Sequence, residues 1–407
     1  MIASTDAGEA VDAPRLRRRE LARRARLVAA ADQFVVARDD GQTVIAGYHW
    51  FSDWGRDTMI ALPGLTLTTR RFDVARAILL AFSRHLDQGL IPNRFPDAGE
   101  APEYNTVDGT LWFIEAVRAF LAATGDHAFV RERLYPALVE IITWHERGTR
   151  YGIRMDDDGL LLAGEADTQL TWMDARIGNW AVTPRHGKPV EIQALWYNAL
   201  RFVALLAREY GDMAVARRLR STAARARRNL APAFWNAEAG CLFDVVRGDD
   251  RDPSIRPNQI IAVSLPFTML TQGQSRDVVR IVERDLLTPY GLRTLAPEDS
   301  RYQGRYEGDG ATRDARYHQG PAWPWLRGPF VTAYLKVHRW SAAARRQADG
   351  WLQPLRNHLA DAGFGQVSEL FDGDPPHTPR GCIAQAWSVA ELLRATTECR
   401  DGVVSRS

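Results

Sequence analysis

PVEIQALWYNALRFVALLAREYG, residues 189–211, is the stretch that decides the fold class. Apolar side chains recur in it every three or four residues, which is the period at which one face of an α-helix repeats. That face consists of Ile192, Leu195, Trp196, Ala199, Val203 and Leu206. The pattern therefore predicts a long helix with one buried face.

The same period recurs along the chain and predicts about twelve helices of similar length. We expect them at residues 15–33, 57–69, 71–88, 106–124, 127–147, 189–211, 213–233, 256–272, 275–286, 318–338, 340–361 and 381–397. Convincing strands are few, and we expect short ones near residues 34–38, 160–163 and 242–245. Helices of similar size joined in pairs predict an all-α fold that closes into a double ring. In such a ring the inner helices bury a core, and the loops at one end form a mouth.

The domain organisation is expected to be simple, because no Pro/Gly/Ser-rich spacer occurs between residues 31 and 396. We therefore expect one domain at 31–398. It would be preceded by a tail and a basic helix at 1–30 and followed by a short tail at 399–407. The arginine-rich run at 15–26 is interpreted as a solvated helix face, because apolar residues are interspersed in it.

Composition excludes several classes of partner. The chain of 407 residues is 25% charged with a formal net charge of +2, which favours neither nucleic acid nor an anionic membrane. It contains no run of about 18 apolar residues, so no membrane span is expected. The three cysteines, Cys241, Cys382 and Cys399, fit no metal motif. Their odd number and the lack of an apolar leader at the N-terminus favour a cytoplasmic location.

Function is expected in the long loops, which are rich in Trp, Tyr, Asp, Glu, Arg and Gly. These loops lie at residues 47–57, 91–108, 163–176, 305–325 and 365–381. Tryptophan beside carboxylates suits sugars, because an indole ring covers the apolar face of a pyranose and carboxylates bind its hydroxyls. The loops therefore indicate a carbohydrate-binding mouth.

Two carboxyl groups in these loops are candidates for glycoside hydrolysis, which needs one acid and one base or nucleophile. Asp174 directly follows a Trp and a Met, and apolar surroundings raise the pKa of a proton donor. Glu369 lies on a glycine-rich loop that could present a base to water. Taken alone, each residue also fits a plainer interpretation, Asp174 as a helix cap and Glu369 as a solvated loop residue. Further carboxylates in the loops compete for these roles, namely Glu165, Asp167, Glu191, Glu307, Asp309 and Asp314.

Other chemistries lack their motifs. The sequence has no Cys-x-x-Cys, no paired histidines of metalloprotease type, no phosphate-binding Gly-x-x-x-x-Gly-Lys and no Gly-x-Ser-x-Gly. We therefore expect neither a metal nor a cofactor. His318 is the only attractive histidine base, which leaves an isomerase as a weaker alternative.

Ten segments together resemble a known family. They are AGYHWFSDWGRDTMIALPGL (46–65), GLIPNRFPD (89–97), PEYNTVDGTLWF (102–113), TQLTWMDAR (168–176), GKPVEIQALWYNAL (187–200), SIRPNQIIAVSLP (254–266), LLTPYGLRTLAP (286–297), GRYEGD (304–309), YHQGPAWPW (317–325) and FDGDPPHTPRGCIAQAWSVAELL (371–393). In this order they resemble the C-terminal glucosidase domain of bacterial glycogen debranching enzymes, the amylo-α-1,6-glucosidase family. The resemblance runs from about residue 31 to residue 396.

This resemblance implies an (α/α)6 barrel related to glucoamylase and an inverting mechanism without a cofactor. It assigns the acid to Asp174, in the Trp-Met-Asp motif, and the base to Glu369, in the late Glu-Leu loop. Arg56 and Asp57 would bind hydroxyls of the non-reducing glucose, with Trp54 in its wall. The full set expected to bind substrate is Trp50, Asp53, Trp54, Arg56, Asp57, Tyr104, Asn105, Asp108, Trp172, Lys188, Glu191, Glu307, His318, Gln319 and Trp323.

The expected substrate is glycogen or a branched α-glucan oligosaccharide, cut at single α-1,6-linked glucose stubs. One departure is clear, since bacterial relatives carry an N-terminal domain where only residues 1–30 precede the match here. A separately encoded glucan-binding domain is therefore a candidate partner. Two other functions stay open. One is a glycosidase of the same fold acting on trehalose, glucosyl- or mannosyl-glycerate or α-1,4 ends, and the other is a non-catalytic glucan-binding protein.

Overall fold

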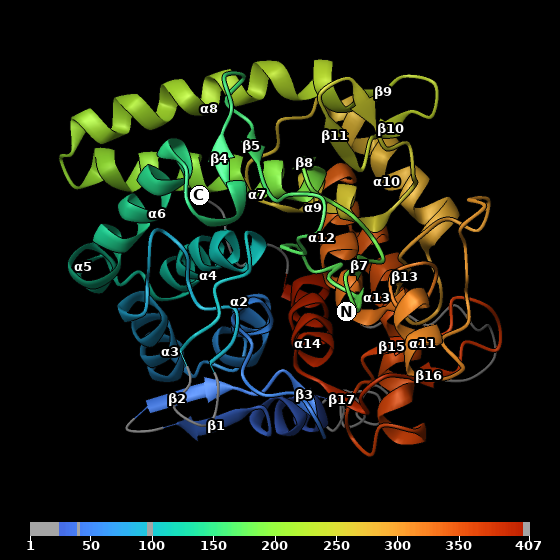
Figure 1. Ribbon diagram of the computed structural model, residues 1–407. Coiled ribbons are helices and arrows are strands. Elements are labelled where there is room, and N and C mark those ends of the chain that lie inside the picture. The colour runs from blue at the N-terminus through green and yellow to red at the C-terminus, as the bar shows by residue number, and fades with distance from the viewer. Residues whose placement is uncertain (1–23, 39–40, 96–100, 402–407) are drawn as a thin grey trace.

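The protein is mostly helical in the computed structural model, which describes residues 24–38, 41–95 and 101–401 (Figure 1). Within these residues six helices form an inner layer, in which each helix packs against the next and the last packs back on the first. In chain order they are α2 (Gly55–Leu62), α4 (Asp108–Thr124), α7 (Val190–Glu209), α9 (Ile261–Ser264), α12 (Arg327–Val337) and α14 (Ala386–Asp401). Their contacts thus run in a closed circuit.

A second layer of helices packs on the outside of this circuit. It consists of α3 (Phe72–Arg84) on α4, α6 (Tyr135–Arg147) and α8 (Met213–Phe234) on α7, α10 (Gln272–Leu286) on α12, and α13 (Ala342–Asp361) on α12 and α14. Figure 1 shows α8 lying along α7. The sequence explains the two layers. Nearly every side chain of α7 is buried, whereas α8 buries a single stripe and exposes most of its arginines.

Helix ends follow local capping chemistry. Asp212 accepts a hydrogen bond from the backbone of Val215 at the start of α8, and Thr271 and Gln274 form a capping box at the start of α10. Shorter helical segments complete the description. They are α5 (His127–Phe129), α11 (Gly310–Arg316), the π-helical turns η1 (Pro63–Leu67) and η2 (Val130–Leu134), and the 3-10 turns η3 (Arg150–Gly152), η4 (Pro257–Ile260) and η5 (Pro324–Leu326).

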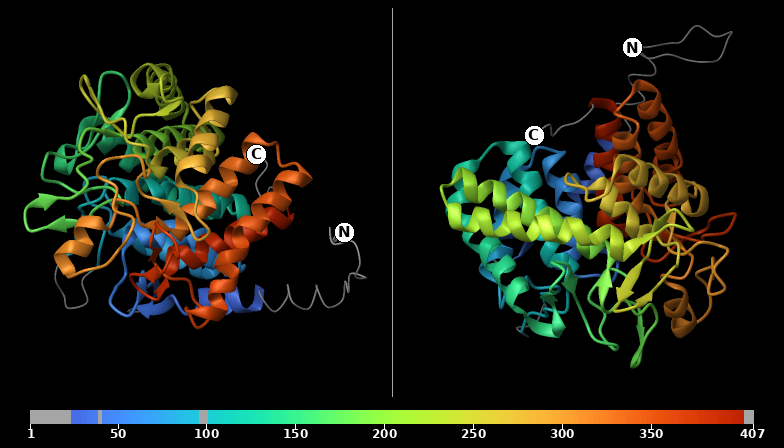
Figure 2. Two further views of the ribbon diagram at one scale, coloured as in Figure 1. Left: turned by 90° about the vertical axis from the view of Figure 1, so that its right-hand side faces the viewer. Right: turned by 90° about the horizontal axis from the view of Figure 1, so that it is seen from above.

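Short antiparallel strands tie the loops together. The pairs are β1 (Val35–Arg38) with β2 (Gly41–Val44), β3 (Gly47–Tyr48) with β17 (Ala384–Gln385), β4 (Arg154–Met155) with β5 (Leu161–Leu162), β6 (Arg176–Ile177) with β7 (Trp180–Ala181), and β9 (Trp235–Asn236) with β10 (Cys241–Leu242). Two larger sheets have the orders β8-β11-β12 and β13-β14-β15-β16. Their strands are β8 (Lys188–Pro189), β11 (Val245–Arg247), β12 (Asp250–Arg251), β13 (Leu292–Arg293), β14 (Ala322–Trp323), β15 (Leu370–Phe371) and β16 (Pro379–Arg380). Figure 2 shows hairpins and loops projecting from one side of the helices. The β3–β17 pair joins the segments that lead into α2 and α14, where the circuit closes.

The predominantly helical character predicted from the sequence is confirmed, but several boundaries were wrong. The segment 318–338 begins as a turn and strand β14, and α12 starts only at Arg327. The segment 256–272 is helical only to Ser264, because Pro266 disfavours helical backbone at the preceding residue. The expected strand at 242–245 is divided between β10 and β11, and α11 was not predicted.

The predictions for the two ends of the chain can be compared with the structure only in part, because some of these residues lie outside the described ranges. Residues 24–32 are helical and Gln33 lies in a turn, whereas residues 1–23, which include the first part of the helix predicted at 15–33, and residues 402–407 lie outside the described residues. At the other end α14 continues to Asp401, so residues 399–401, expected in a tail, are helical, and Cys399 is buried. In the described part of the chain, no helix is both long and apolar enough to span a membrane.

Candidate active site

Polar residues at or just before the starts of the inner helices meet in one buried region. They are Arg56 and Asp57 in α2, Asp108 in α4, Glu191 in α7, Asn258 in η4 ahead of α9, and Gln385 ahead of α14. The positive ends of the helix dipoles favour negative charge here. Two sets of charged residues occupy this region. We call Arg56, Asp57, Asp108, Asp174 and Glu369 the active-site cluster, and Arg185, Glu191, Asp244, Arg256 and Asn258 the Arg185 cluster.

Arg56 lies at the centre of the active-site cluster and is only 2% exposed. Its Nε donates to both carboxylate oxygens of Asp108 at 2.9 Å, and its Nη1 donates to Asp174 Oδ2 at 2.8 Å. Burial alone would lower the arginine's pKa, but the two carboxylates outweigh burial and raise it. The buried Nη2 has no hydrogen-bond partner among the described residues. It is therefore an available donor inside the site.

Asp174 follows Trp172 and Met173 on the loop that ends at β6, and 34% of its side chain is exposed. Its surroundings raise its pKa mainly through desolvation, while the charge of Arg56 acts in the opposite direction. This direction agrees with the apolar environment expected from the sequence. Asp174 is thus a carboxyl group that solvent reaches and that holds its proton more strongly than usual.

Glu369 is more deeply placed, with 2% exposure. Its Oε2 accepts a hydrogen bond from the backbone N–H of Cys382 at 2.8 Å, and its Oε1 accepts one from the hydroxyl of Tyr317. Burial raises the pKa of Glu369 to about 7, against the two hydrogen bonds that lower it, and the charge of Asp174 raises it further. The carboxyl therefore titrates near neutral pH.

Asp57 completes a group of mutually repelling carboxyls. Its pKa is raised to about 8 by burial and by the charges of Asp174, Glu369 and Asp108, with Arg56 lowering it. Each of these acids lies within electrostatic range of Asp57. In the described part of the chain no hydrogen bond joins Asp174 to Glu369, so the two carboxyls interact through their charges alone.

Aromatic rings wall this region. Trp172 packs edge-on against His318, Trp323 and Trp325, with ring centroids 5.2–5.3 Å apart, and Trp325 stacks on Trp387 at 5.4 Å. Edge-to-face pairs of this kind are favourable and hold rings in fixed orientations. The Nε1 of Trp172 donates to Asn258 Oδ1 at 2.7 Å, which links the wall to the Arg185 cluster.

The Arg185 cluster is a compact ion-pair network behind the Asp174 loop. Arg185 donates to both carboxylate oxygens of Glu191 and to both of Asp244. Asn258 donates to Asp244 at 2.7 Å, and Arg256 lies 3.9 Å from the same carboxylate. All five side chains are buried. Every carboxylate oxygen in this network therefore has a donor.

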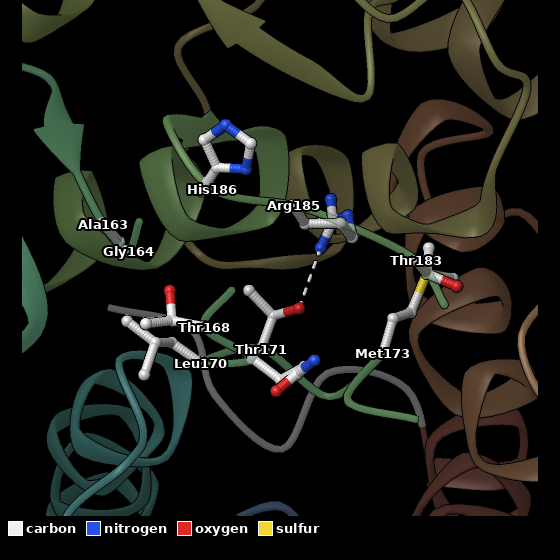
Figure 3. Close-up of a pocket in the computed structure, with 10 residues that line it drawn as sticks. Ala163, Gly164, Thr168, Leu170, Thr171, Met173, Thr183, Arg185 and His186 are labelled. Carbon is white, nitrogen blue, oxygen red and sulfur yellow. Dashed lines mark hydrogen bonds between the residues drawn. The ribbon is translucent and has the colours of Figure 1, made fainter. Parts of the chain in front are cut away.

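A small pocket lies between the Asp174 loop and this network (Figure 3). Figure 3 shows the hydrogen bond that Arg185 donates to the hydroxyl of Thr171, with Met173 and Thr183 to one side and Gly164 and His186 to the other. Its volume is about 10 Å³. Pockets that bind organic ligands measure roughly 300–1,000 Å³, so this pocket is far too small for a sugar ring.

Several residues expected to bind substrate have other partners in the structure. Asp53 accepts hydrogen bonds from Arg38 at 2.6 Å and from Thr43 at 3.2 Å, both in the β1–β2 hairpin. Lys188 pairs with Asp156 at 2.7 Å and Asp158 at 2.6 Å. Neither residue contacts the charged groups of the active-site cluster through a hydrogen bond found among the described residues.

The others are spread around the region. Trp50 is 64% exposed on the turn after β3. Trp54 lies next to Arg94, Tyr104 donates to the carbonyl of His85, Asn105 accepts from Asn93 at 3.5 Å, and Glu307 lies 3.7 Å from Arg380.

Two members of the YHQG segment face inward. Gln319 is held by Arg256 and Thr183. His318 is fully buried, and neither of its ring nitrogens has a partner in the described structure. Burial and nearby arginines hold its pKa well below its usual value, which makes it a weak base.

The structure also adds residues that the sequence reasoning did not select. Tyr317, Cys382 and Gln385 contact Glu369 or Asp57, and Arg185 and Asp244 organise the second network. Tyr317 and Cys382 stand inside quoted motifs, next to His318 and Gly381. The motif membership was visible, but their contacts depend on tertiary structure.

The chain matches a known protein family. The pattern of the family described as amylo-alpha-1,6-glucosidase matches residues 29–394. The chain belongs to the amylo-alpha-1,6-glucosidase family. The resemblance inferred from the sequence motifs is thereby confirmed.

Two curated proteins are similar to the chain to different extents. A glycogen debranching enzyme of Saccharomyces cerevisiae is 27% identical over 441 residues, covering 84% of this chain and 29% of its own length. A solabiose phosphorylase of Paenibacillus borealis is 30% identical over 209 residues, covering 48% of this chain and 26% of its own. The chain thus spans less than a third of these curated relatives. Family and relatives together support an enzyme of the glucosidase type.

A solved structure supports the fold alone. An uncharacterized conserved protein from Thermus thermophilus superposes with a TM-score of 0.64 at 17% identity, covering 91% of this chain and 99% of that one. The agreement over nearly the whole length of both chains indicates a shared helical architecture.

Proposed function

We propose that the protein is an inverting glycoside hydrolase that releases glucose from α-1,6 branch stubs of glycogen or of branched α-glucan oligosaccharides. Its scaffold is an (α/α)6 barrel, which the closed circuit of inner helices with a second layer outside supports. The active-site cluster lies where the inner helices begin. The reaction needs two carboxyl groups and a water molecule, and neither metal nor cofactor.

The observation that carries the proposal is the electrostatic coupling of Asp174 and Glu369. These two residues come from loops far apart in the sequence, yet the charge of one raises the pKa of the other. In an inverting enzyme the two carboxyls lie roughly 6.5–9.5 Å apart, so that a water molecule fits between one of them and the sugar. Their interaction without a direct hydrogen bond is in keeping with such a gap.

Exposure and hydrogen bonding support the assignment of roles. Asp174 is the acid, because it is reached from solvent, where the leaving glucan must lie, and its pKa is raised. Glu369 is the base, because it lies deeper and Tyr317 and the Cys382 N–H orient both of its oxygens. A pKa of about 7 suits a base that must be ionised at neutral pH and yet take a proton.

Arg56 and Asp57 hold the hydroxyls of the glucose in this proposal. The unpartnered Nη2 of Arg56 is a donor to one hydroxyl. Asp57, with a pKa of about 8, is mostly protonated at pH 7 and can both donate to and accept from another. The aromatic wall around Trp172 encloses the site. We also propose a cytoplasmic location, which the three free and buried cysteines favour.

The decisive experiment is proton NMR of the purified chain acting on a glucan that carries single α-1,6-glucosyl stubs. We expect β-glucose to appear first and its release to be lost in Asp174→Asn. Linear maltooligosaccharides and trehalose serve as substrate controls, and each reaction is run with and without inorganic phosphate, because one relative is a phosphorylase.

Three outcomes would contradict the proposal. Release of α-glucose first would indicate retention, and activity that requires phosphate would indicate phosphorolysis. Activity on trehalose or on α-1,4 ends without activity on the stubs would keep the acid–base pair but move the function to another glycoside.

A further inference from the structure

A chain of hydrogen bonds connects the proposed base to the proposed glucose-binding carboxyl. The backbone N–H of Cys382 donates to Glu369 Oε2 at 2.8 Å, and the thiol of Cys382 donates to Gln385 Oε1 at 2.7 Å. The side-chain Nε2 of Gln385 then donates to Asp57 Oδ1 at 3.2 Å. One cysteine and one glutamine thus bridge Glu369 and Asp57.

The backbone around this bridge is fixed on both sides. The N–H of Glu369 donates to the carbonyl of Cys382 at 2.9 Å, so residues 369 and 382 are joined by a backbone bond as well as through the carboxylate. Gln385 donates its own N–H to the carbonyl of Val367 at 2.9 Å and pairs with Gly47 across β3 and β17. The bridge therefore rests on the short sheet where the helix circuit closes.

Two glycines make room for it. A Cβ at Gly47 would lie 2.3 Å from Gln385 Oε1 and 2.6 Å from the sulfur of Cys382. A Cβ at Gly381 would lie 2.2 Å from Glu369 Oε2, and Gly381 also has a φ of +66°. Such distances are far below normal contact, so only glycine at these two positions permits the bridge to pack as it does.

We propose that Cys382 and Gln385 are positioning residues that hold Asp57 and Glu369 in one fixed relative geometry, so that the glucose and its attacking water are aligned together. This inference rests on the proposed function, because it assigns both carboxyls to the same sugar. Neither Cys382 nor Gln385 touches the sugar in the proposal.

The hydrogen-bonding groups of Cys382 and Gln385 determine how the Gln385 amide is oriented toward Asp57. A thiol has a single proton, and the sulfur of Cys382 lies 2.7 Å from the oxygen of the Gln385 amide and 3.3 Å from the carbonyl oxygen of Ala384, so the amide is the nearer of its two acceptors. That contact turns the amide so that its NH2 group faces Asp57. Without the thiol donor the amide loses this contact, and its orientation toward Asp57 is no longer fixed from that side.

Cys382→Ser retains a donor at this position, Cys382→Ala removes it, and Gln385→Met removes the donor to Asp57 at similar volume. We expect Cys382→Ala and Gln385→Met each to lower kcat/KM on α-1,6 stubs about 10- to 100-fold, mainly through a higher KM. Cys382→Ser should stay within about threefold of the wild type. The kcat/KM of the double variant Cys382→Ala/Gln385→Met should be no lower than that of the less active single variant, because both substitutions break the same chain of hydrogen bonds.

Cys399→Ala is the matched control, since Cys399 is also buried but lies near the end of α14. Equal activity of Cys382→Ala and Cys399→Ala would overturn the inference, as would multiplied losses in the double variant or a serine variant as weak as the alanine one. Urea unfolding of the same set tests the bridge separately from activity. If the wild type itself cleaves no glycoside, the proposed function fails, and non-additive unfolding free energies of Cys382→Ala and Gln385→Met still test the bridge.

Discussion

The active-site cluster and the Arg185 cluster are both buried and both built from Arg, Asp and Glu, yet their charge balance differs. The active-site cluster has four carboxyls, Asp57, Asp108, Asp174 and Glu369, around the single guanidinium of Arg56. The Arg185 cluster has two carboxyls, Glu191 and Asp244, facing the guanidiniums of Arg185 and Arg256. One set is crowded with acids, and the other is neutral overall.

The difference has chemical consequences. Buried acids that outnumber their counter-ions repel one another and bind protons near neutral pH, as Glu369 does with a pKa of about 7 and Asp57 with a pKa of about 8. Such groups can exchange protons with a substrate. In the Arg185 cluster every carboxylate oxygen already has a donor, so it is suited to hold loops in place. Burial of charge alone therefore does not separate the two clusters, whereas an excess of acids favours the active-site cluster as the place for proton transfer.

The largest expected effect is on catalysis in the active-site cluster. Asp174→Asn and Glu369→Gln keep the shapes of the side chains but remove the proton donor and the base, respectively. We expect kcat on α-1,6 stubs to fall about 10²–10⁴-fold in each variant. The free energy of unfolding, measured in urea at pH 7, should change much less than in variants of the Arg185 cluster. Near-normal turnover by either variant would transfer the catalytic role to another carboxyl.

The Arg185 cluster should respond in the opposite way. Glu191→Gln leaves Arg185 with one fewer negative partner in a buried position, and loss of one member of a buried ion pair costs roughly 3–5 kcal/mol of stability. We expect that loss in urea unfolding, together with a KM close to that of the wild type below the unfolding transition. A raised KM with unchanged stability would instead restore Glu191 to the substrate-binding set expected from the sequence.

The pH dependence of kcat/KM tests whether Glu369 acts as the base or as the acid. If Glu369 is the base, it must be ionised, so kcat/KM should fall about tenfold for each pH unit below 7. If Glu369 were the acid, kcat/KM would instead fall above pH 7. Because Glu369, Asp57 and Asp174 interact, the midpoint belongs to the coupled group. The same measurement on Asp57→Asn should leave the midpoint nearly unchanged, because Asp57, with a pKa of about 8, is already mostly protonated in the pH range in which Glu369 titrates.

The helical character and the family were predicted from the sequence and are confirmed, and the same reasoning selected two candidate carboxyls, because each of these features leaves a local mark. Helical periodicity is written in segments such as 189–211, and the Trp-Met-Asp order places apolar groups beside Asp174. Helix starts were less predictable. Residues 318–326 carry a helical mixture of apolar side chains but form turn, strand β14 and η5, because Gly320, Pro321 and Pro324 disfavour a helix there.

Partners across long sequence separations could not be predicted at all. Nothing local in the sequence pairs Arg56 with Asp108 and Asp174, or Cys382 with Gln385 and thereby with Asp57. Whether a carboxylate faces sugar or an arginine depends on such partners, and the sequence did not show that Glu191 pairs with Arg185.

Lys188 gives the smallest effect and tests this last point. Its ammonium group pairs with Asp156 and Asp158, whose side chains are 39% and 31% exposed, so solvent weakens both attractions. Partly exposed pairs contribute at most about 1 kcal/mol. We expect Lys188→Met to lower the free energy of unfolding by about that amount and to leave KM for α-1,6 stubs within about twofold. A larger rise in KM at unchanged stability would mean that Lys188 leaves its two aspartates to bind the glucan. Lys188, at the start of β8, would then belong to the substrate-binding residues, as expected from the sequence.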